Sequence, residues 1–506
     1  MANPSLPVVD VVWFKRDLRV SDHAPLWHAA QQANVLPLYV IEPELWQQAD
    51  ASNRHWAFIK DALTDCRESL KQLGQALVVR EGDVCDVFDE LSQIVKINAV
   101  HAHQETGNLW SYQRDIKVAQ YFKAHDIAFH EYRQQGVLRG PVDRNDWADR
   151  WDQFMAEQLI PTPEKIGSID IPPGDIPETA PGHPNPFVLR EMTPSRQGAE
   201  KALARFLQEQ SAYYPARIGQ PGARFASSRL SAHLAWGTLS IREVVHAIHQ
   251  TLADARTEER QHFGLQQFKS RLYWHCHFIQ KLESEPSIEI EELNPAFSGL
   301  RGGKDDEHRL KAWQLGKTGW PLVDACMRSL IATGWLNFRM RALLVSVASN
   351  QLWLPWQLTA PYLAKLFVDY EPGIHYPQIQ MQSGTTGINQ LRMYNPIKQS
   401  QDNDPKGEFI KRYIPELRFV PAQWIHTPWL LPLNLQREYR VILDRDYPRP
   451  IVDHEAAAQF AKEQVYQTKR SPEAKRFNKR IVEKHASRRR TSRMRESGPK
   501  PQMELF

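Results

Sequence analysis

Two patterns of hydrophobic spacing divide the chain. Between residues 7 and 133, short apolar runs rich in β-branched side chains alternate with longer amphipathic stretches of helical period, such as 56–73. The short runs cover residues 8–14, 36–41, 77–80, 97–102 and 127–132. Strands that alternate with helices require right-handed crossovers, which build a doubly wound parallel sheet. This part is predicted to be an α/β domain of nucleotide-binding type, although no GxGxxG follows its first strand.

The second pattern is long helical periodicity, which begins after about residue 193. It is clearest at residues 199–210, 241–255, 263–282, 322–333 and 339–351. Between the two patterns, prolines recur at 161–194, which removes amide donors and favours extended backbone. The sequence thus predicts four segments: an α/β domain at 7–133, a proline-rich interdomain linker at 134–198, an all-α domain at 199–480 and a basic C-terminal tail at 481–506.

Composition narrows the class of protein. With 506 residues and 42% hydrophobic side chains, the chain is long enough for two or three domains. No apolar run reaches the roughly 18 residues of a membrane span. The N-terminus has no basic stretch followed by an apolar one, so no secretory signal is predicted. We therefore expect a cytoplasmic protein that does not enter a membrane.

Cysteine spacing and charge exclude further classes. The four cysteines are scattered without a CxxC pair, which disfavours a disulfide framework, a zinc ribbon or an iron–sulfur site. His275 and His277 flank Cys276, but alternate residues diverge around a helix, so no metal site is predicted. Net charge is only 63 − 59 = +4, yet residues 469–495 are rich in lysine and arginine. That segment is either a solvated surface or an extra attraction for a polyanion such as DNA.

Hydroxyl side chains cluster at Ser227, Ser228 and Ser231, ahead of a predicted helix. Hydroxyls and free amides at a helix start can hold a phosphate, because the helix dipole favours anions there. The alternative is that Ser231 only caps the helix. The motif by itself leaves both readings open.

Arginines, carboxylates and aromatics are concentrated at 333–396, inside otherwise apolar helical sequence. Unpaired charges are expensive to bury, so these groups need partners or a ligand. Arg341 and Asp369 lie on separate predicted helical segments. They could form an ordinary buried salt bridge, or they could line a site for a polar cofactor ring.

The sequence VVWFKRDLRVSD at residues 11–22 resembles the opening of the photolyase/cryptochrome flavoproteins. The hydroxyl cluster, the Trp- and Gly-rich stretch at 313–325 and the charged stretch at 333–396 follow in the order and spacing of that family, so that the resemblance covers about residues 7–420. It implies an antenna-type α/β domain, a helical domain that binds FAD in a U shape, and photochemistry driven by blue light.

The resemblance assigns cofactor contacts residue by residue. The phosphates of FAD would meet Ser227, Ser228, Leu230 and Ser231, with Tyr214 as a neighbour. The flavin ring would lie beside Arg341, Asp369 and Glu371. His275 stands where many members have an arginine near the phosphates, and an imidazole is a weaker anchor than a guanidinium.

The resemblance also marks departures around the ring. His375 falls where other members place an asparagine or aspartate facing the reactive flavin nitrogen, and its imidazole could donate, accept or transfer a proton. Of the family's three electron-transfer tryptophans only Trp356 is retained, since Ile379 and Gly303 occupy the other places. Trp335, Trp353, Tyr370 and Tyr376 are candidates for an alternative route.

The residues expected to face the substrate are Trp274, Arg271, Asn337 and His375. Arg271 replaces a family glutamate, whereas Trp274 keeps the aromatic platform on which a flipped-out base would stack. Phe338 and Ala342 replace an asparagine and a methionine. Hydrogen bonding to a lesion is therefore expected to differ from that of the usual repair enzymes.

The leading hypothesis is an FAD-dependent, blue-light-driven DNA photolyase that repairs UV-induced pyrimidine dimers by electron transfer from reduced flavin. Its partner would be damaged DNA, single-stranded or double-stranded, and we expect it to be a monomer. The alternative is a cryptochrome-type photoreceptor that uses the same photochemistry without repair, although no long signalling tail follows the helical domain. A second antenna chromophore, folate or deazaflavin, is a further expectation, but Trp110 and Ser111 replace the asparagine–glutamate pair of folate-binding relatives.

Overall fold

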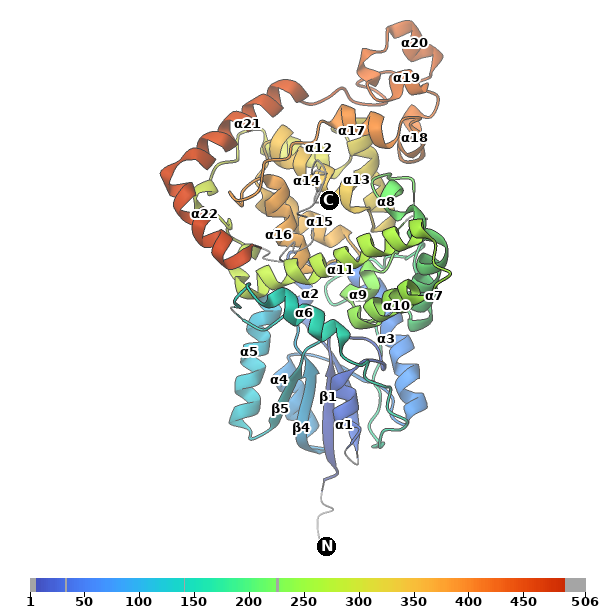
Figure 1. Cartoon of the computed structure of the whole chain (residues 1–506), viewed down its shortest axis with the longest axis vertical. Coiled ribbons are helices and arrows are strands. Elements are labelled where there is room, and N and C mark those ends of the chain that lie inside the picture. Colours follow the sequence, from blue (N-terminus) through green and yellow to red (C-terminus); the bar gives the residue numbers. More distant parts are fainter. Residues whose placement is uncertain (1–5, 32–33, 141, 224–226, 487–506) are drawn as a thin grey trace.

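The computed structural model describes residues 6–31, 34–140, 142–223 and 227–486 of the chain. It has a lower α/β part and an upper helical part in the view of Figure 1. Residues 487–506, which hold most of the predicted basic tail, lie outside the described residues. None of the helices described is long and apolar enough to cross a membrane.

The N-terminal part is built on one parallel sheet of five strands in the order β3-β2-β1-β4-β5. The strands are β1 (Val8–Phe14), β2 (Val35–Ile41), β3 (Val78–Glu81), β4 (Lys96–His103) and β5 (Ala128–Tyr132). Val12 of β1 is paired with Pro37 of β2 on one side and with His101 of β4 on the other. The predicted doubly wound parallel sheet is confirmed, and the observed ends of its strands differ from the predicted ones by at most one residue.

Helices cover both faces of this sheet. They are α1 (Ala24–Ala29), α2 (Pro43–Trp46), α3 (Asn53–Leu73), α4 (Val84–Ser92) and α5 (Leu109–Ala124). Apolar side chains of α1 and α3 pack on one face with Val12 and Phe14 of β1. Those of α4 and α5 pack on the other face with Val11 and Trp13. Because successive residues of a strand point to opposite faces, the side chains on both faces of β1 are buried.

The segment predicted as a linker is more structured than expected. Residues 147–156 of it form α6 (Trp147–Ala156), which buries Trp147 and Trp151 in the core shared by α10 (Ile241–Ala253) and α11 (Glu259–Ser284). After α6 the chain has no helix or strand as far as residue 195. It lies against the α/β domain, where the carbonyl of Pro173 accepts a hydrogen bond from the amide of Val79 at 2.7 Å. Proline spacing signalled the extended part, and the pair of tryptophans at helical spacing was the missed signal for α6.

The remaining chain is helical, as predicted. Its helices are α7 (Arg196–Arg205), α8 (Tyr214–Arg217), α9 (Ser231–Ala235), α10 (Ile241–Ala253), α11 (Glu259–Ser284), α12 (Asp306–Gln314), α13 (Pro321–Thr333), α14 (Phe338–Ser346), α15 (Trp356–Leu366), α16 (Pro372–Ser383), α17 (Pro396–Asn403), α18 (Glu408–Tyr413), α19 (Ala422–Ile425), α20 (Leu433–Glu438), α21 (His454–Arg470) and α22 (Pro472–His485).

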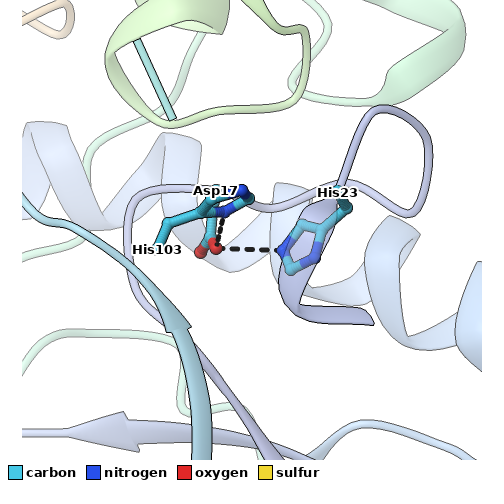
Figure 2. Close-up of side chains that lie close together, drawn as sticks. All are labelled: Asp17, His23 and His103. Atoms are coloured by element: carbon cyan, nitrogen blue, oxygen red, sulfur yellow. Dashed lines mark hydrogen bonds and ion pairs between the residues drawn. The ribbon is translucent and has the colours of Figure 1, made fainter. Parts of the chain in front are cut away.

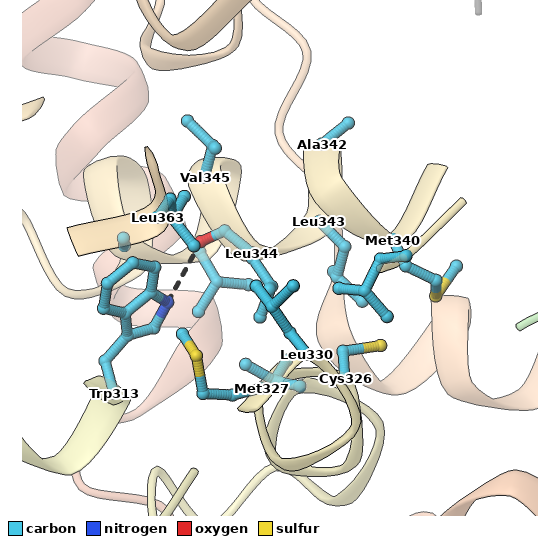
Figure 3. Close-up of a cluster of buried hydrophobic side chains, with 14 of the residues drawn as sticks. Trp313, Cys326, Met327, Leu330, Met340, Ala342, Leu343, Leu344, Val345 and Leu363 are labelled. Atoms are coloured by element: carbon cyan, nitrogen blue, oxygen red, sulfur yellow. Dashed lines mark hydrogen bonds between the residues drawn. The ribbon is translucent and has the colours of Figure 1, made fainter. Parts of the chain in front are cut away.

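The core of this domain forms where α13 and α14 pack together (Figure 3). Pro321 opens α13, and Gly334 ends it in the left-handed conformation at φ 75°. Trp313 lies fully buried beside Met327, and its indole N–H donates to the carbonyl of Leu344 at 3.2 Å. This packing fixes α14, which carries Arg341 to the neighbouring cavity.

Candidate cofactor cavity

The helical domain contains a cavity with about 1210 Å³ of space, which opens to solvent. Its walls come from the segment before α9 and from α11, α14, α15 and α16. Of the residues predicted to bind the cofactor, it is lined by Tyr214, Ser227, Ser228, Ser231, His275, Arg341, Asp369, Glu371 and His375. Leu230 lies buried between two of the serines.

One end of the cavity carries the three serines. The hydroxyl of Ser227 is buried and has no hydrogen-bond partner. Ser231 accepts a hydrogen bond from the indole of Trp335 at 3.3 Å. The alternative that Ser231 caps α9 is wrong. Leu230 is the N-cap and Ser231 is already the first residue of the helix, so no side chain caps α9. Ser231 therefore lines the cavity beside Ser227 and Ser228 without capping the helix.

Tyr214 closes this end of the cavity. Its ring packs against Phe206 and Phe268, and its hydroxyl is hydrogen-bonded to Arg271. Burial raises the pKa of Tyr214 to about 12, so that the phenol stays protonated at neutral pH. The side chain can therefore donate a hydrogen bond to an anion such as a phosphate.

The opposite end is built around the Arg341–Asp369 ion pair. The guanidinium donates to Asp369 Oδ2 at 2.7 Å and to the carbonyl of Leu336 at 2.8 Å, and it stacks over the ring of Phe367. The other carboxylate oxygen, Asp369 Oδ1, is buried without a partner. The salt bridge predicted as an alternative does form, but it leaves one acceptor unsatisfied at the cavity wall.

Glu371 is held from the α/β side of the molecule. Arg16, which follows β1, donates to Glu371 Oε2 at 3.3 Å and to the carbonyl of Tyr370 at 2.6 Å. Oε1 of Glu371 is buried and has no partner. Burial raises the pKa of this carboxyl group, and the charge of Arg16 opposes the shift.

Two histidines line the cavity in the neutral state. Burial lowers the pKa of His275 and of His375 to about 4. The Nε2–H of His375 donates to the carbonyl of Ala360 at 2.9 Å, so its Nδ1 carries a lone pair and can only accept. The sequence left open whether the imidazole of His375 donates, accepts or transfers a proton. The hydrogen bond to Ala360 leaves Nδ1 free only to accept. Nδ1 of His275 is buried without a partner.

Several buried polar atoms of the cavity have no hydrogen-bond partner, and we call them orphaned atoms. They test whether the cavity suits a cofactor such as FAD. Buried polar groups in native proteins nearly always have partners, so several unsatisfied atoms around one cavity point to a ligand. They are Ser227 Oγ, His275 Nδ1, Asp369 Oδ1, Glu371 Oε1 and Gln378 Oε1. The hydroxyl end suits phosphates and the carboxylate end suits the N–H groups of a flavin ring. The residues present fit FAD.

The predicted substrate residues are only partly brought together. Asn337 lines the cavity, but its Oδ1 caps α14 through the amide of Met340 and its Nδ2 donates to the carbonyl of Gln220. Trp274 and Arg271 are not among the cavity-lining residues. Trp274 lies on the adjacent face of α11 and contacts the rings of His277 and Phe278.

The predicted electron-transfer residue Trp356 lies buried at the start of α15, and its indole N–H has no partner. Its ring centroid is 6.4 Å from that of Tyr376. Tyr376 in turn lies 5.2 Å from His375, and His375 lies 5.4 Å from Tyr370. Ile379 lines the cavity at a position where the resemblance places a tryptophan. Among the described residues, these ring contacts connect Trp356 to the cavity wall.

A second cavity, of about 710 Å³, lies at the carboxyl ends of β1, β2 and β4, where the strand order reverses. Ligands of doubly wound folds bind at such a switch point. Trp13, Tyr39, Trp46 and Trp236 are its aromatic walls, and Ser111 also lines it, whereas Trp110 lies outside it. We call it the α/β cleft.

The charges of the α/β cleft are paired with one another. Arg114 bonds to Glu42, to Glu105 and to Asp115, and Lys15 bonds to Asp115 at 3.2 Å. Among the described residues that line this cleft, no buried side-chain atom lacks a hydrogen-bond partner.

Sequence reasoning missed a buried cluster of Asp17, His23 and His103 in the α/β domain (Figure 2). Asp17 Oδ2 accepts from His23 Nε2 at 2.9 Å and from His103 Nδ1 at 2.7 Å, and its other oxygen accepts from the amide of Lys15. The amide of Leu26 donates to His23 Nδ1. These N–H groups hold the pKa of Asp17 well below its usual range, and the cluster ties the loop after β1 to the end of β4.

Other missed residues line the cofactor cavity or hold the residues that line it. Gln378 supplies one of the orphaned oxygens, Phe367 stacks on Arg341, and Arg16 holds Glu371. Residues 371, 375, 378 and 382 recur at helical spacing on one face of α16. That periodicity was a usable signal for Gln378, whereas the contact between Arg16 and Glu371 spans 355 positions.

A nucleotide-type α/β domain, joined to a helical domain whose cavity is polar at both ends, defines a two-domain cofactor-binding protein. Comparison with known proteins specifies it. Residues 10–146 match the family model of DNA photolyase, and residues 268–467 match the FAD binding domain of DNA photolyase. The chain is 31% identical over 476 residues to a cryptochrome DASH from Gloeobacter violaceus, covering 88% of this chain and 93% of the relative. It belongs to the photolyase/cryptochrome family, and FAD is its cofactor.

Both branches of the family are represented among the relatives. The chain is 28% identical over 471 residues to a deoxyribodipyrimidine photo-lyase from Alkalihalophilus pseudofirmus, covering 88% of this chain and 95% of that protein. An archaeal photolyase from Sulfolobus tokodaii, solved with two FAD molecules, has the same fold with a TM-score of 0.74 and 23% identity. The match covers 90% of this chain and 99% of that one.

Proposed function

We propose that this protein is a monomeric, cytoplasmic DNA photolyase that repairs UV-induced pyrimidine dimers, with the four segments predicted from sequence as its domains. The observation that carries the proposal is the solvent-open cavity of the helical domain, which combines five orphaned polar atoms with an Arg–carboxylate pair. Family membership supports light-driven chemistry at this site.

The hydroxyl end would hold the phosphates of the cofactor. Ser227 would donate its unpaired hydroxyl, with Ser228 and Ser231 beside it, and Tyr214 would donate from its protonated phenol. His275 is neutral and adds a hydrogen bond without a charge. Phosphate binding would therefore rely on hydroxyl and amide donors more than on cations.

The carboxylate end would orient the ring. Bound FAD, in its reduced form, supplies the absorption of blue light and the electron for repair. Asp369 Oδ1 and Glu371 Oε1 would accept from the ring N–H groups, and Arg341 would place its positive charge beside the ring. His375 would hold a lone pair towards its edge, because its Nε2–H is committed to Ala360.

Electron supply from the protein would follow the aromatic contacts from Trp356 through Tyr376. Their rings are 6.4 Å apart, and Tyr376 contacts His375 at the cavity wall. Comparing light-driven cofactor reduction in wild type, Tyr376→Phe and Trp356→Phe tests this route. Equal rates in all three proteins would remove it.

Damaged DNA is the proposed substrate. A base flipped from the helix would meet the apolar mouth of the cavity near Phe338 and Ala342, and stacking of this kind is worth about 1–3 kcal/mol per base. Asn337 would shape this wall, since its polar groups already serve α14. Arg271 and Trp274 stay in the proposal as residues that contact DNA next to the cavity.

We place a second chromophore in the α/β cleft, where Trp13, Tyr39 and Trp46 offer stacking surfaces. Its charges are already paired, so a ligand there would gain few new polar contacts. A planar ring such as a deazaflavin or flavin suits the aromatic walls better than a folate, since Trp110 and Ser111 stand at the folate-specific positions. The related archaeal photolyase holds two FAD molecules.

A photoreceptor of cryptochrome type is the second candidate. Arg271, Phe338 and Ile379 stand at positions where repair enzymes of the family carry other residues, and one of the relatives is a cryptochrome DASH. These replacements would keep the flavin photochemistry while weakening contacts to a lesion.

One experiment separates the two candidates. Reduced protein is illuminated with single- and double-stranded oligonucleotides that carry a cyclobutane dimer or a 6-4 lesion, and intact pyrimidines are counted. Repair that requires light, and that is absent in the dark and in the FAD-free protein, is expected. No repair of either lesion in either strand form would sink the enzyme proposal and leave the photoreceptor.

A further inference from the structure

The C-terminal end of α11 lies beside the start of α6 and close to α22 (Figure 1). A cluster of basic side chains is buried at this end of α11. It consists of Arg144, from the segment before α6, and His277 and Lys281, one turn apart on α11. Their exposed fractions are 4%, 2% and 9%. None of them lines the cofactor cavity or the α/β cleft.

The contacts within this basic cluster bring cationic groups together. Arg144 Nη2 donates to His277 Nδ1 at 2.7 Å, so the imidazole is neutral with its proton on Nε2. The guanidinium stacks over Trp147, and the ammonium of Lys281 lies over the ring of Phe278. Nη1 of Arg144 is fully buried without a hydrogen-bond partner.

The nearby carboxylates are committed elsewhere. Glu285 pairs with Lys484 at 2.8 Å and with His485 at 2.6 Å. Glu283 accepts from Arg139 and from the amide of Gly140, and Asp146 pairs with Arg150. Within the described parts of the chain, no carboxylate lies within ion-pair distance of Arg144 or Lys281.

We propose that Arg144, His277 and Lys281 bind a small inorganic anion. Two buried cations without a counterion are strongly unfavourable, and one anion would satisfy both charges together with the orphaned Nη1–H. The alternative, loss of the proton from Lys281, is incomplete at neutral pH, because burial beside Arg144 lowers the pKa of that amine only to about 8. Arginine keeps its charge in any case.

The burial of all three side chains limits the ligand to a compact ion. Chloride and phosphate share the required negative charge and acceptor capacity, whereas an extended organic anion would need an opening. The site is independent of the cofactor and of the proposed repair activity, so its test does not depend on either.

The test is thermal unfolding of the full-length, FAD-loaded protein at pH 7 and constant ionic strength. Sodium chloride and sodium phosphate are titrated separately against sodium gluconate, whose anion is too large for the site. The midpoint Tm should rise with the logarithm of the concentration of one of the small anions, by about 1–3 °C for each tenfold increase above its dissociation constant. Calorimetric titration of the wild type with that anion should give one site per chain.

Variants locate the effect. Lys281→Met and Arg144→Met should lose this rise in Tm, whereas Lys201→Met, which removes an exposed lysine of α7, should keep it. If a variant fails to fold, the wild-type calorimetric titration still decides. The absence of saturable binding of either anion, or an equal response in all variants, would overturn the proposal.

Discussion

The two cavities of this protein differ in whether their buried polar groups have hydrogen-bond partners. In the cofactor cavity of the helical domain, five buried side-chain atoms face the interior without partners. In the α/β cleft, Arg114, Lys15 and their carboxylates satisfy one another. Both cavities are large, with about 1210 Å³ and 710 Å³ of space, so the pairing of their polar groups is the clearer difference.

The difference shows what prepares a cavity for a tightly held ligand. Unsatisfied buried atoms destabilise the empty protein and return that free energy when a ligand supplies the missing bonds. A cleft whose charges are already paired gains little free energy from new polar bonds to a ligand. The affinity of its ligand then depends on stacking alone. We therefore expect FAD to be retained in the helical domain and the second chromophore to be held weakly.

The largest expected effect concerns the α/β cleft. Arg114→Met would leave Glu42, Glu105 and Asp115 buried near one another with only Lys15, and loss of one member of a buried ion pair costs about 3–5 kcal/mol. Urea unfolding should show that loss, with FAD content per folded chain unchanged. Lys117→Met removes an exposed ion pair with Asp83 and should change stability by less than about 1 kcal/mol. Similar losses in both variants would contradict the comparison.

The next effect is a pH dependence of the cofactor cavity. Folding lowers the pKa of His375 from 6.5 to about 4, so its contribution is full above pH 6.5 and is lost as the pH falls through about 4. The contribution is on the order of 3 kcal/mol. The free energy of unfolding of His375→Asn should therefore fall less steeply with acid than that of the wild type. The control His308→Asn, at an exposed position, should follow the wild type, and a His375→Asn curve parallel to both would disprove the assignment.

Arg341→Met is expected to weaken FAD binding by about 100-fold, because the buried Asp369 loses its charged partner and the ring loses a cation. The affinity can be measured by quenching of flavin fluorescence on titration of the apoprotein. Arg205→Met, on the exposed side of α7, is the matched control. An affinity within threefold of the wild type in both variants would remove Arg341 from the site.

Ser227→Ala should have the smallest effect. A hydrogen bond to a charged group such as a phosphate is worth about 1.5–3 kcal/mol, and because Ser228 and Ser231 lie beside Ser227 we expect the lower end of that range, which corresponds to an affinity for FAD about 10 times weaker. The same fluorescence titration measures it, with the exposed Ser298→Ala as control. An unchanged affinity would mean that the Ser227 hydroxyl does not meet the cofactor.

The fold was largely predictable because its signals are local. The strands of the sheet show as buried apolar runs, and Pro321 and Gly334 mark both ends of α13. Helix α6 was missed because it lies in a segment in which proline dominated the composition, although Trp147 and Trp151 carry a helical repeat.

The site was predictable in membership and less so in geometry. The predicted cofactor residues other than Leu230 line one cavity. They could be named from the sequence because the resemblance assigned them motif by motif. The orientation of Trp274 away from that cavity, the N-cap bonds of Asn337 and the contact of Arg16 with Glu371 depend on how distant elements pack. No local pattern in the sequence encodes them.

The central claim is that FAD occupies the helical cavity and does not depend on the α/β cleft. Ala342 lines the former and Ala51 lines the latter, so a matched pair of alanine-to-tryptophan changes can fill each in turn. FAD released from each folded variant is quantified against protein by absorbance. Our account predicts that Ala342→Trp loses its FAD and that Ala51→Trp keeps one per chain. Retention in Ala342→Trp with loss in Ala51→Trp would contradict it.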